Sequence, residues 1–549
     1  MAKDSTPPRS LFDSKSSAPR EPATSGALER RDFLKVAGAG AGLLLLGGCA
    51  PAANPEVPGI QPKRRFPLIG RSSPDIIVIG AGAWGGWTAL NLRQMGAKVT
   101  LVDAYGPGNA RSTSGDESRG VRSSYGDRST GEHWMLWARE AMKRWTAFDD
   151  TWGRDMRLGL FHTTGDLILR ADWEPYLVNN KKWWDKHNIP YQALKPEDVR
   201  KIFPVISMDD IKIVLYEPDA GVVRARRACQ AVAAAFERLG GKIVIGRASP
   251  SKVTNGRLEE IALDTGRKLT AETFVYAPGP WMQKTFPELF EKNPMRTPLG
   301  YVCYYGTPVG DERFTYPNMP SFNFPGVTGW AALPVDNLGF RVRGGERAPG
   351  QAPGGGGGAA APAATGATKR TAGGRGAAKA PAGAANATGG GGFGNTANTP
   401  PAQLDPDTSD RWPDPAHMDG PRRFVSHRFP LLKDAPLLAT HCCHYEISPS
   451  GNFIVDRHPH RTNVWIAGGG NAEGFKFGPV IGEYVAQRVM GEEGSPAVAK
   501  AFKYDAPPDT TRRNRNTGAN AAQAPADSGR GANTAPAAKD SAATAGRGG

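Results

Sequence analysis

The chain is poor in cysteine and histidine, with five and nine of them among 549 residues. The cysteines show no spacing that would mark a disulfide framework. The apolar run at residues 36–48 is too short for a transmembrane helix, which needs about 20 apolar residues. Basic clusters interleaved with aromatic residues, typical of nucleic-acid binding, are also missing. We therefore expect neither a disulfide scaffold, nor a spanning helix at this run, nor a nucleic-acid partner.

Two segments hold too little apolar surface to fold. Residues 348–402 consist almost entirely of Gly, Ala, Pro, Thr and Asn, and residues 507–549 have the same character. Such segments bury too little apolar area to offset the entropy of ordering, so we expect a disordered insertion and a disordered tail. Much of the formal net charge of +15 lies on these two segments and on the first 49 residues. The basic character therefore does not indicate a folded basic face.

The first 49 residues resemble an export signal. The stretch ERRDFLK is similar to a twin-arginine motif, and the apolar run after it ends in LGGC, which looks like a lipobox with Cys49 as the lipidated residue. We expect residues 1–49 to be a lipoprotein-type signal peptide and residues 50–74 a tether. The partners would be the twin-arginine export machinery and the membrane, through the lipid on Cys49, in the periplasm. The alternative is an ordinary signal peptide with a chance cysteine.

From Asp75 the sequence DIIVIGAGAWGGWTALNLRQMGAKVTLVD follows the pattern of a strand, a glycine turn, a helix and a second strand. Gly80 permits the tight turn, Gly82 lets the backbone approach a pyrophosphate, and Gly85 lets the helix pack closely on the strand. Asp103 closes the second strand, where its carboxylate can accept hydrogen bonds from a ribose. The unit predicts dinucleotide binding, and this pattern is common to NAD and FAD.

Three further blocks resemble the flavin amine oxidases typified by monomeric sarcosine oxidase and N-methyltryptophan oxidase, in the D-amino-acid-oxidase superfamily. They are SGDESRGVRSSYG, FVYAPGPW with Gly279, and residues 441–483 with Gly474. The resemblance implies FAD as the cofactor, with Gly279 and Gly474 beside it. It also implies an α/β fold, in which a Rossmann-like FAD-binding domain of the DAO type carries a substrate domain built on an antiparallel sheet.

The two domains are expected to be discontinuous in sequence. The insertion would hang from the substrate domain, because the chain leaves at Gly344 and returns near Asp405. The FAD-binding domain would comprise residues 75–160, 217–290 and 444–500, and the substrate domain residues 161–216 and 291–443.

Four basic residues match positions that act in catalysis in these relatives. Arg119 would lie over the flavin, while Arg122 and Lys476 would grip the substrate carboxylate, a task that suits the forked donors of a guanidinium. For Arg119 and Arg122 the alternative is that both are surface ion-pair partners, and for Lys476 it is that this is a surface lysine. Arg341 stands where sarcosine oxidases carry a lysine that activates O₂. Because arginine does not donate and recover a proton as lysine does, the electron acceptor stays open between O₂ and a quinone or carrier.

The segment HCCH, residues 441–444, invites a metal interpretation. Adjacent side chains of a strand point to opposite faces, so four consecutive residues do not converge on one ion, and no metal site is expected. Cys443 instead matches the cysteine that is thioether-linked to the flavin in sarcosine oxidase relatives, and a thiolate is the nucleophile for such a bond. A buried structural cysteine beside non-covalent FAD is the alternative. Glu473 replaces a histidine of the relatives and either pairs with an arginine or receives a cationic substrate group.

Together these features predict an FAD-dependent enzyme that oxidises the C–N bond of an amino acid or secondary amine by hydride transfer. Arg122 and Lys476 would hold the carboxylate, and Arg119 and Arg341 would stabilise negative charge on the reduced cofactor. Two alternatives stay open. One is a flavin-dependent hydroxy-acid dehydrogenase, and the other is a non-catalytic surface lipoprotein that carries FAD.

Overall fold

The computed structural model describes residues 73–128, 130–153, 159–334, 338–346, 405–413 and 415–508. The predicted signal peptide, the insertion, nearly all of the tether and nearly all of the tail lie outside the described residues. Within those residues, no helix is both long enough and apolar enough to span a membrane.

The predicted βαβ unit forms the centre of a six-stranded sheet. β1 (Asp75–Ile79) pairs in parallel with β2 (Lys98–Asp103) on one side and with β13 (Thr273–Tyr276) on the other. The strand order is β19-β20-β13-β1-β2-β9, and only the pair β19–β20 is antiparallel. The carboxyl ends of the parallel strands therefore meet at one edge, where open α/β sheets bind their ligands. The outer strands are β9 (Lys242–Ile245), β19 (Ile454–Arg457) and β20 (Val464–Gly468).

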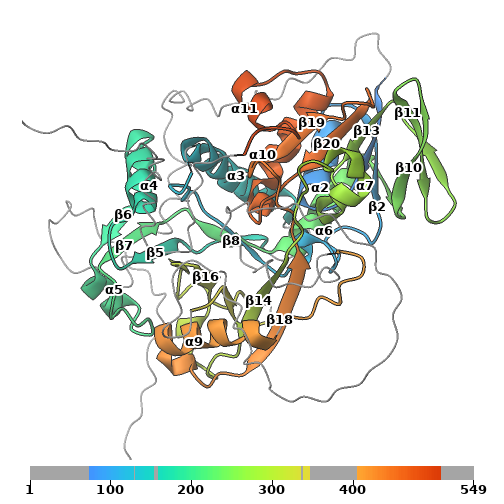
Figure 1. Cartoon of the computed structure of the whole chain (residues 1–549). Coiled ribbons are helices and arrows are strands. Elements are labelled where there is room, and N and C mark those ends of the chain that lie inside the picture. Colours follow the sequence, from blue (N-terminus) through green and yellow to red (C-terminus); the bar gives the residue numbers. More distant parts are fainter. Residues whose placement is uncertain are drawn as a thin grey trace, which may run out of the picture.

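Helices cover this sheet and enclose one large apolar core (Figure 1). α2 (Ala83–Gln94) follows the glycine turn and is buried over almost its whole length, because other helices pack against it. A side chain at Gly482 would lie 2.4 Å from the Cβ atom of Trp87, so glycine allows the close approach of α10 to α2. The covering helices are α3 (Gly131–Thr151), α6 (Ala225–Arg238), α10 (Gly478–Val489) and α11 (Pro496–Ala501).

A second sheet of eight strands has the order β18-β14-β17-β16-β15-β5-β7-β6. The sequence predicted an antiparallel sheet, and the pairings agree except that β15 and β5 run parallel. The two strands of this parallel pair come from distant parts of the chain. A tight turn joins only antiparallel strands, so parallel neighbours require a longer connection. The strands are β5 (Asp166–Arg170), β6 (Gln192–Leu194), β7 (Ile213–Glu217), β14 (Leu299–Tyr305), β15 (Ser321–Phe324), β16 (Val327–Trp330), β17 (Phe340–Arg343) and β18 (Leu437–His444).

Smaller elements connect and flank the two large sheets. A three-stranded sheet of order β3-β8-β4 carries Arg119 at its start, and Figure 1 shows β8 between the large sheets. The remaining strands are β3 (Arg119–Val121), β4 (Phe161–Thr163), β8 (Gly221–Val223), β10 (Ala248–Thr254), β11 (Arg257–Leu263) and β12 (Lys268–Thr270). The remaining helices of the described residues are α4 (Pro175–Lys186), α5 (Pro196–Ile202), α7 (Met282–Thr285) and α9 (Asp419–Arg428).

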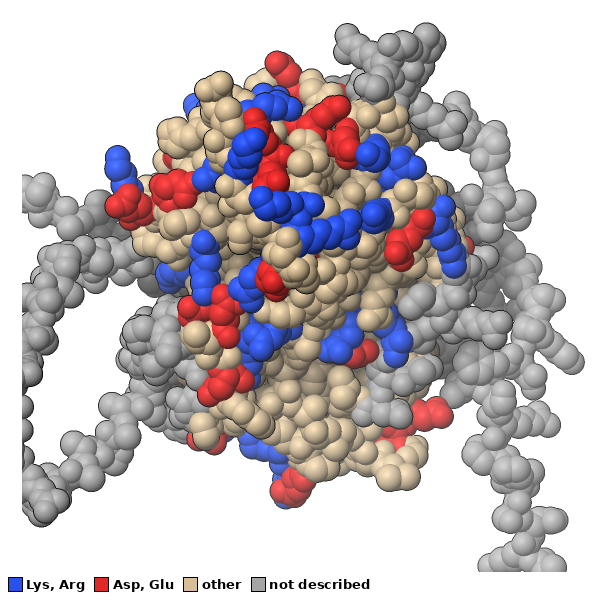
Figure 2. Space-filling model, turned by 90° about the vertical axis from the view of Figure 1, so that its right-hand side faces the viewer, with Lys and Arg blue, Asp and Glu red and all other residues tan. Residues whose placement is uncertain are grey.

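The charged side chains of the surface are of both signs. On the face shown in Figure 2, acidic and basic side chains lie interspersed over the described part of the chain. Interspersed charge of this kind gives short-range ion pairs, such as Lys252 with Glu259 at 2.6 Å, rather than a long-range field of one sign.

Candidate functional site

The glycine turn after β1 is shaped by backbone contacts that admit no side chain. Gly80 has φ +103°, and a Cβ atom there would lie 2.2 Å from the carbonyl oxygen of Ala277. A Cβ atom at Gly85 would lie 1.8 Å from the carbonyl oxygen of Gly80. Gly82, the N-cap of α2, instead faces only the Ser114 hydroxyl, at 3.3 Å from a Cβ atom built there. The turn thus brings backbone without side chains to a helix N-terminus, whose positive end favours anions such as phosphate.

Asp103 lies beside this turn at the end of β2. Its carboxylate accepts hydrogen bonds from the backbone N–H groups of Ala81 at 2.7 Å and of Tyr105 and Gly106 at 2.8 Å. Burial raises the pKa of Asp103, and these hydrogen bonds oppose that rise. The acid is therefore fixed at the sheet edge where the sequence predicted a ribose contact.

A short 3₁₀ helix, η1 (Thr113–Gly115), joins the glycine turn to the second sheet. The Ser114 hydroxyl accepts a hydrogen bond from the N–H of Ala83 at 3.1 Å, at the start of α2. The Thr113 hydroxyl donates to the carbonyl oxygen of His444 at 2.6 Å, at the end of β18. The start of α2, which follows the glycine turn, and the end of β18 are thereby held next to each other.

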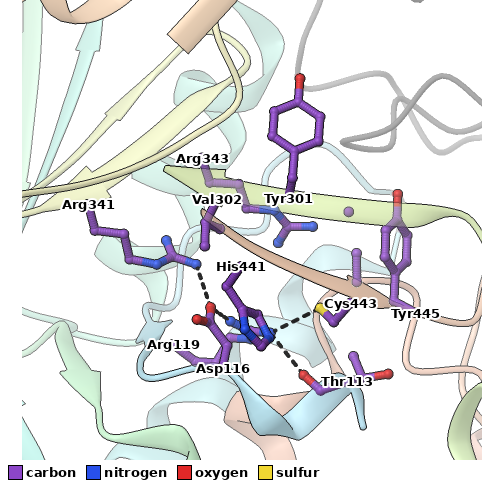
Figure 3. A pocket seen from close by; sticks show the side chains of 12 residues that line it. Thr113, Asp116, Arg119, Tyr301, Val302, Arg341, Arg343, His441, Cys443 and Tyr445 are labelled. Carbon is purple, nitrogen blue, oxygen red and sulfur yellow. Dashed lines mark hydrogen bonds and ion pairs between the residues drawn. The ribbon is translucent and has the colours of Figure 1, made fainter. Parts of the chain in front are cut away.

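A pocket opens between η1, β14, β17 and β18 (Figure 3). Two of the predicted catalytic residues, Arg119 and Arg341, line it together with Cys443. The full lining is Thr113, Asp116, Arg119, Gly300, Tyr301, Val302, Arg341, Arg343, His441, Cys443, Tyr445 and Ala472.

Asp116 organises the cationic side of this pocket. The side chain is 1% exposed and forms ion pairs with Arg119 and, at 3.1 Å, with Nη2 of Arg341. It also accepts a hydrogen bond from the Tyr304 hydroxyl at 2.9 Å, and Arg341 lies 4.0 Å above the Trp330 ring. Burial lowers the pKa of Arg119 to about 10, so the guanidinium remains charged at neutral pH.

Cys443 is the polarised thiol of the pocket. Its Sγ atom lies 3.5 Å from Nη2 of Arg119, and His441 lies on the same face of β18. Burial raises the pKa of the thiol, but a hydrogen bond with His441 and the charge of Arg119 outweigh it and lower the pKa to about 6. By contrast, burial raises the pKa of the neighbouring Cys442 to about 12. Cys443 is therefore the one of the two that carries thiolate character at neutral pH.

Arg122 and Lys476 lie outside the lining of this pocket but near each other. Lys476, on η9 (Gly474–Phe477), is 5% exposed and donates to the Tyr125 hydroxyl at 2.8 Å. Burial raises the pKa of the Asp166 carboxyl, and the charges of Arg122 and Lys476 both lower it. The charges of the two predicted carboxylate-binding cations therefore both act on the same buried internal carboxylate.

The two other predicted cofactor glycines lie at the same edge of the six-stranded sheet. Gly279 has φ +58° and lies three residues after the end of β13. The carbonyl oxygen of Gly474 accepts a hydrogen bond from the indole N–H of Trp84 at 2.9 Å, which fixes it against the start of α2. Next to it, Glu473 forms an ion pair with Arg128 at 3.1 Å. This agrees with the expectation that Glu473 pairs with an arginine.

The sequence missed Asp116, Arg343 and Asp166. Asp116 stands three residues before Arg119 in a loop. In a loop, spacing along the sequence does not predict which side chains lie close together. Arg343 stands two residues after Arg341 on a strand, so alternation alone would have placed both on one face. Among the described residues, no group of three or more His, Cys, Asp or Glu has the arrangement of a metal site, and Cys229, Cys303, Cys442 and Cys443 are free.

Comparison with known proteins agrees with this architecture. A family model described as FAD dependent oxidoreductase (DAO) matches residues 75–488, more than half of the chain. Peroxisomal sarcosine oxidase from Homo sapiens is 24% identical over 416 residues, covering 76% of this chain and 92% of that protein. N-methyl-L-tryptophan oxidase from Yersinia pestis is 24% identical over 431 residues, covering 78% and 98%. The crystal structure of L-proline dehydrogenase from P. horikoshii, 16% identical, has the same fold, with a TM-score of 0.59 over 79% of this chain and 97% of that one.

Proposed function

Because the chain belongs to the DAO family of FAD-dependent oxidoreductases, we propose that it oxidises the C–N bond of an amino acid, with a secondary amine as the preferred group. Two similar curated proteins are named for sarcosine and N-methyl-L-tryptophan, and both of those compounds are N-methyl amino acids. The shared chemistry is one carboxylate and one secondary amine attached to the same carbon atom. The observation that carries the proposal is a pair of cations outside the arginine-lined pocket, half-buried Arg122 and buried Lys476, whose charges both act on the buried Asp166 carboxyl.

The residues of the chain fit FAD. The glycine turn at residues 80–82 offers open backbone at the N-terminus of α2 for the pyrophosphate, and Asp103 lies where a ribose hydroxyl would bind. The pocket that η1 ties to this turn would receive the ring system. When bound there, FAD supplies the two-electron acceptor for the hydride that leaves the carbon next to nitrogen.

The protein contributes charge and orientation. Arg122 and Lys476 would bind the substrate carboxylate away from water, where an ion pair is stronger than at the surface. Burial also favours the neutral form of the substrate amine, which has to release electron density. Arg119 and Arg341 are held by Asp116 and place fixed positive charge where negative charge develops.

Cys443 would carry the covalent link to the cofactor through the 8α-methyl carbon. The thiolate is stabilised by His441 and Arg119, and this supports the covalent alternative over the structural one. Attachment would form a carbon–sulfur bond in place of the thiol S–H bond and one methyl C–H bond, and the two electrons and two protons released would pass to an external acceptor such as O₂.

The substrate proposal is tested by anaerobic titration of the full-length holoprotein. Sarcosine, other N-methyl amino acids, D-amino acids, glycated amino acids and hydroxy acids are added in turn while the flavin absorbance band is followed. Bleaching by N-methyl amino acids supports the proposal. Bleaching by hydroxy acids alone, or no bleaching at all, contradicts it. Admitting air afterwards shows whether O₂ serves as the acceptor, and a quinone is added in a parallel sample.

We further propose that the enzyme is exported in folded form by the twin-arginine route and held at the membrane by a lipid on Cys49. The support is the motif ERRDFLK with the LGGC segment. Labelling of cells with a radioactive fatty acid tests this directly. The wild-type protein should take up label and a Cys49→Ala variant should not, while replacement of Arg30 and Arg31 by Lys should leave the protein in the cytoplasm.

A further inference from the structure

Residues 405–411 form a loop of irregular structure, which we call the strap. Its own hydrogen bonds hold it in shape. The Asp405 carboxylate accepts a hydrogen bond from the backbone N–H of Asp407 at 2.8 Å. Nη2 of Arg411 donates to the carbonyl oxygen of Pro406 at 2.5 Å. The strap is therefore a compact loop rather than an extended connection.

Asp407 attaches the strap to the six-stranded sheet. Its Oδ1 atom accepts hydrogen bonds from the indole Nε1 of Trp281 at 2.8 Å and from Nη1 and Nη2 of Arg247 at 3.0 Å. Its Oδ2 atom accepts from Nζ of Lys284 at 2.5 Å, and the same lysine pairs with Asp405 at 2.9 Å. Burial raises the pKa of Asp407, but hydrogen bonds from these three side chains outweigh it and lower the pKa. The carboxylate is therefore charged at neutral pH and bound from several directions.

The partners of Asp407 come from both sides of the glycine turn. Trp281 and Lys284 follow β13, whereas Arg247 follows β9. In the sheet, β1 and β2 lie between these two strands, with the glycine turn and Asp103 at their carboxyl ends. All four strands are parallel, so their carboxyl ends share the edge at which a dinucleotide binds. The strap is thus fastened on either side of the predicted nucleotide site.

Two aromatic side chains cross the same edge. Tyr105 follows β2, and its ring centroid lies 6.4 Å from that of Trp281, although β1 separates the two strands that precede them. The Tyr105 hydroxyl accepts a hydrogen bond from Nη2 of Arg247 at 2.6 Å, and the Tyr105 N–H donates to Asp103 at 2.8 Å. The strap and the two rings therefore span the edge at Asp103, where a ribose would bind.

We infer that the strap covers the adenosine half of bound FAD, and that Asp407 is the residue that holds it in place. An ion pair between exposed side chains contributes little by itself, but one carboxylate that gathers three donors forms a network whose parts support each other. Asp407 is thus a positioning residue, which acts through the loops that carry Trp281 and Arg247 and slows release of the cofactor. The inference needs only FAD as the cofactor and does not depend on which amine is oxidised.

Release of FAD from the full-length holoprotein tests this role. A Cys443→Ala background removes the proposed covalent bond, so that dissociated flavin is followed by its rising fluorescence after dilution. Asp407→Ala should release FAD at least about tenfold faster than the background, because charged hydrogen bonds are lost. Asp407→Asn should lie between the two, since an amide oxygen still accepts from the Trp281 indole while the charge is gone. An unchanged release rate in Asp407→Ala would overturn the inference.

The two halves of FAD separate this role from a general loss of stability. ADP contains the adenosine half and FMN the flavin half, and the Kd of each for the full-length apoprotein is measured by titration calorimetry. Asp407→Ala should weaken the binding of ADP at least about tenfold and leave the Kd for FMN within about twofold. Equal weakening of both ligands, or an ADP affinity that does not change, refutes the role of the strap.

Asp185→Ala is the matched control. Asp185 pairs with Lys181 at 2.7 Å and accepts a hydrogen bond from the Tyr191 hydroxyl at 2.7 Å, so it also joins a lysine to an aromatic side chain. It lies on α4, and Figure 1 shows α4 and α7, the helix of Lys284, on opposite sides of the molecule. This variant should leave FAD release and both affinities unchanged. Bound FAD reports whether each variant folds, and Asp407→Asn carries the test where Asp407→Ala does not fold.

Discussion

Replacement of His441 by Gln should slow the covalent attachment of FAD to Cys443. The imidazole hydrogen-bonds the thiol and is, after the opposing effect of burial, the largest influence on its pKa. Glutamine keeps a polar side chain of similar reach but removes the imidazole ring. The cysteine should therefore lose its strongest stabilising partner while Arg119, whose Nη2 atom lies 3.5 Å from Sγ, stays in place.

The size of the effect follows from the thiolate population. With a pKa of about 6, roughly 90% of the Cys443 thiol is ionised at pH 7, whereas an unperturbed thiol with a pKa of 9.0 would be ionised to about 1%. Complete loss of the perturbation would thus reduce the thiolate about 90-fold. Because Arg119 remains and a more basic thiolate is a better nucleophile, we expect attachment at pH 7 to slow by about tenfold.

The assay adds FAD to apoprotein in air and stops samples with acid, so that only covalent flavin stays with the precipitated chain. In the wild type the rate should rise with pH through about 6 and then level off, since the thiolate is the reacting form. In His441→Gln the rise should move to higher pH, and the two rates should converge near pH 9. His460→Gln, at an exposed histidine, is the control. An unchanged pH profile in His441→Gln, or covalent flavin in Cys443→Ala, would refute the reasoning.

Three further predictions concern the substrate, the acceptor and stability. Arg122→Ala should weaken substrate binding by about 10- to 100-fold in anaerobic titrations, because a charged pair with the carboxylate is lost. Arg341→Lys should speed reoxidation of the reduced holoprotein by O₂ at least about tenfold in stopped-flow experiments, since lysine can donate a proton. Burial raises the pKa of Glu217 to about 7, so its contribution to stability is present at low pH and lost as pH rises through 7. Wild type should therefore lose up to about 3 kcal/mol relative to Glu217→Gln between pH 5 and 8 in urea unfolding of the holoprotein.

The nucleotide-binding half of the fold was predictable because its determinants are local. Gly80, Gly85 and Asp103 lie within one βαβ unit, and each has a steric or hydrogen-bonding reason to be there. The fold class and FAD as the cofactor are confirmed by the family match. The domain boundaries in residue numbers stay a prediction, as do the roles of the site residues.

The arrangement of the second sheet could not be read from the sequence. The parallel pairing of β15 with β5 joins residues more than 150 positions apart, and no local pattern encodes which strand becomes the neighbour of another. That pairing puts the Ser321 hydroxyl 2.7 Å from Asp166 and thereby fixes the acid beside Arg122 and Lys476. Asp166 was missed for this reason, since its chemical setting comes from tertiary structure rather than from its sequence neighbours.

Asp116 shows how residues from separate parts of the chain depend on each other in the pocket. It belongs to the segment that follows the βαβ unit, yet its carboxylate is bound by Tyr304 of β14 and Arg341 of β17 as well as by nearby Arg119. One buried charge therefore connects the segment that follows the βαβ unit to the eight-stranded sheet. A buried carboxylate is stable only while its cationic partners stay in place, so the two sheets cannot separate without breaking a costly ion pair. Because Asp116 pairs with both Arg119 and Arg341, a shift of one arginine would also move the other and change where its charge lies in the pocket.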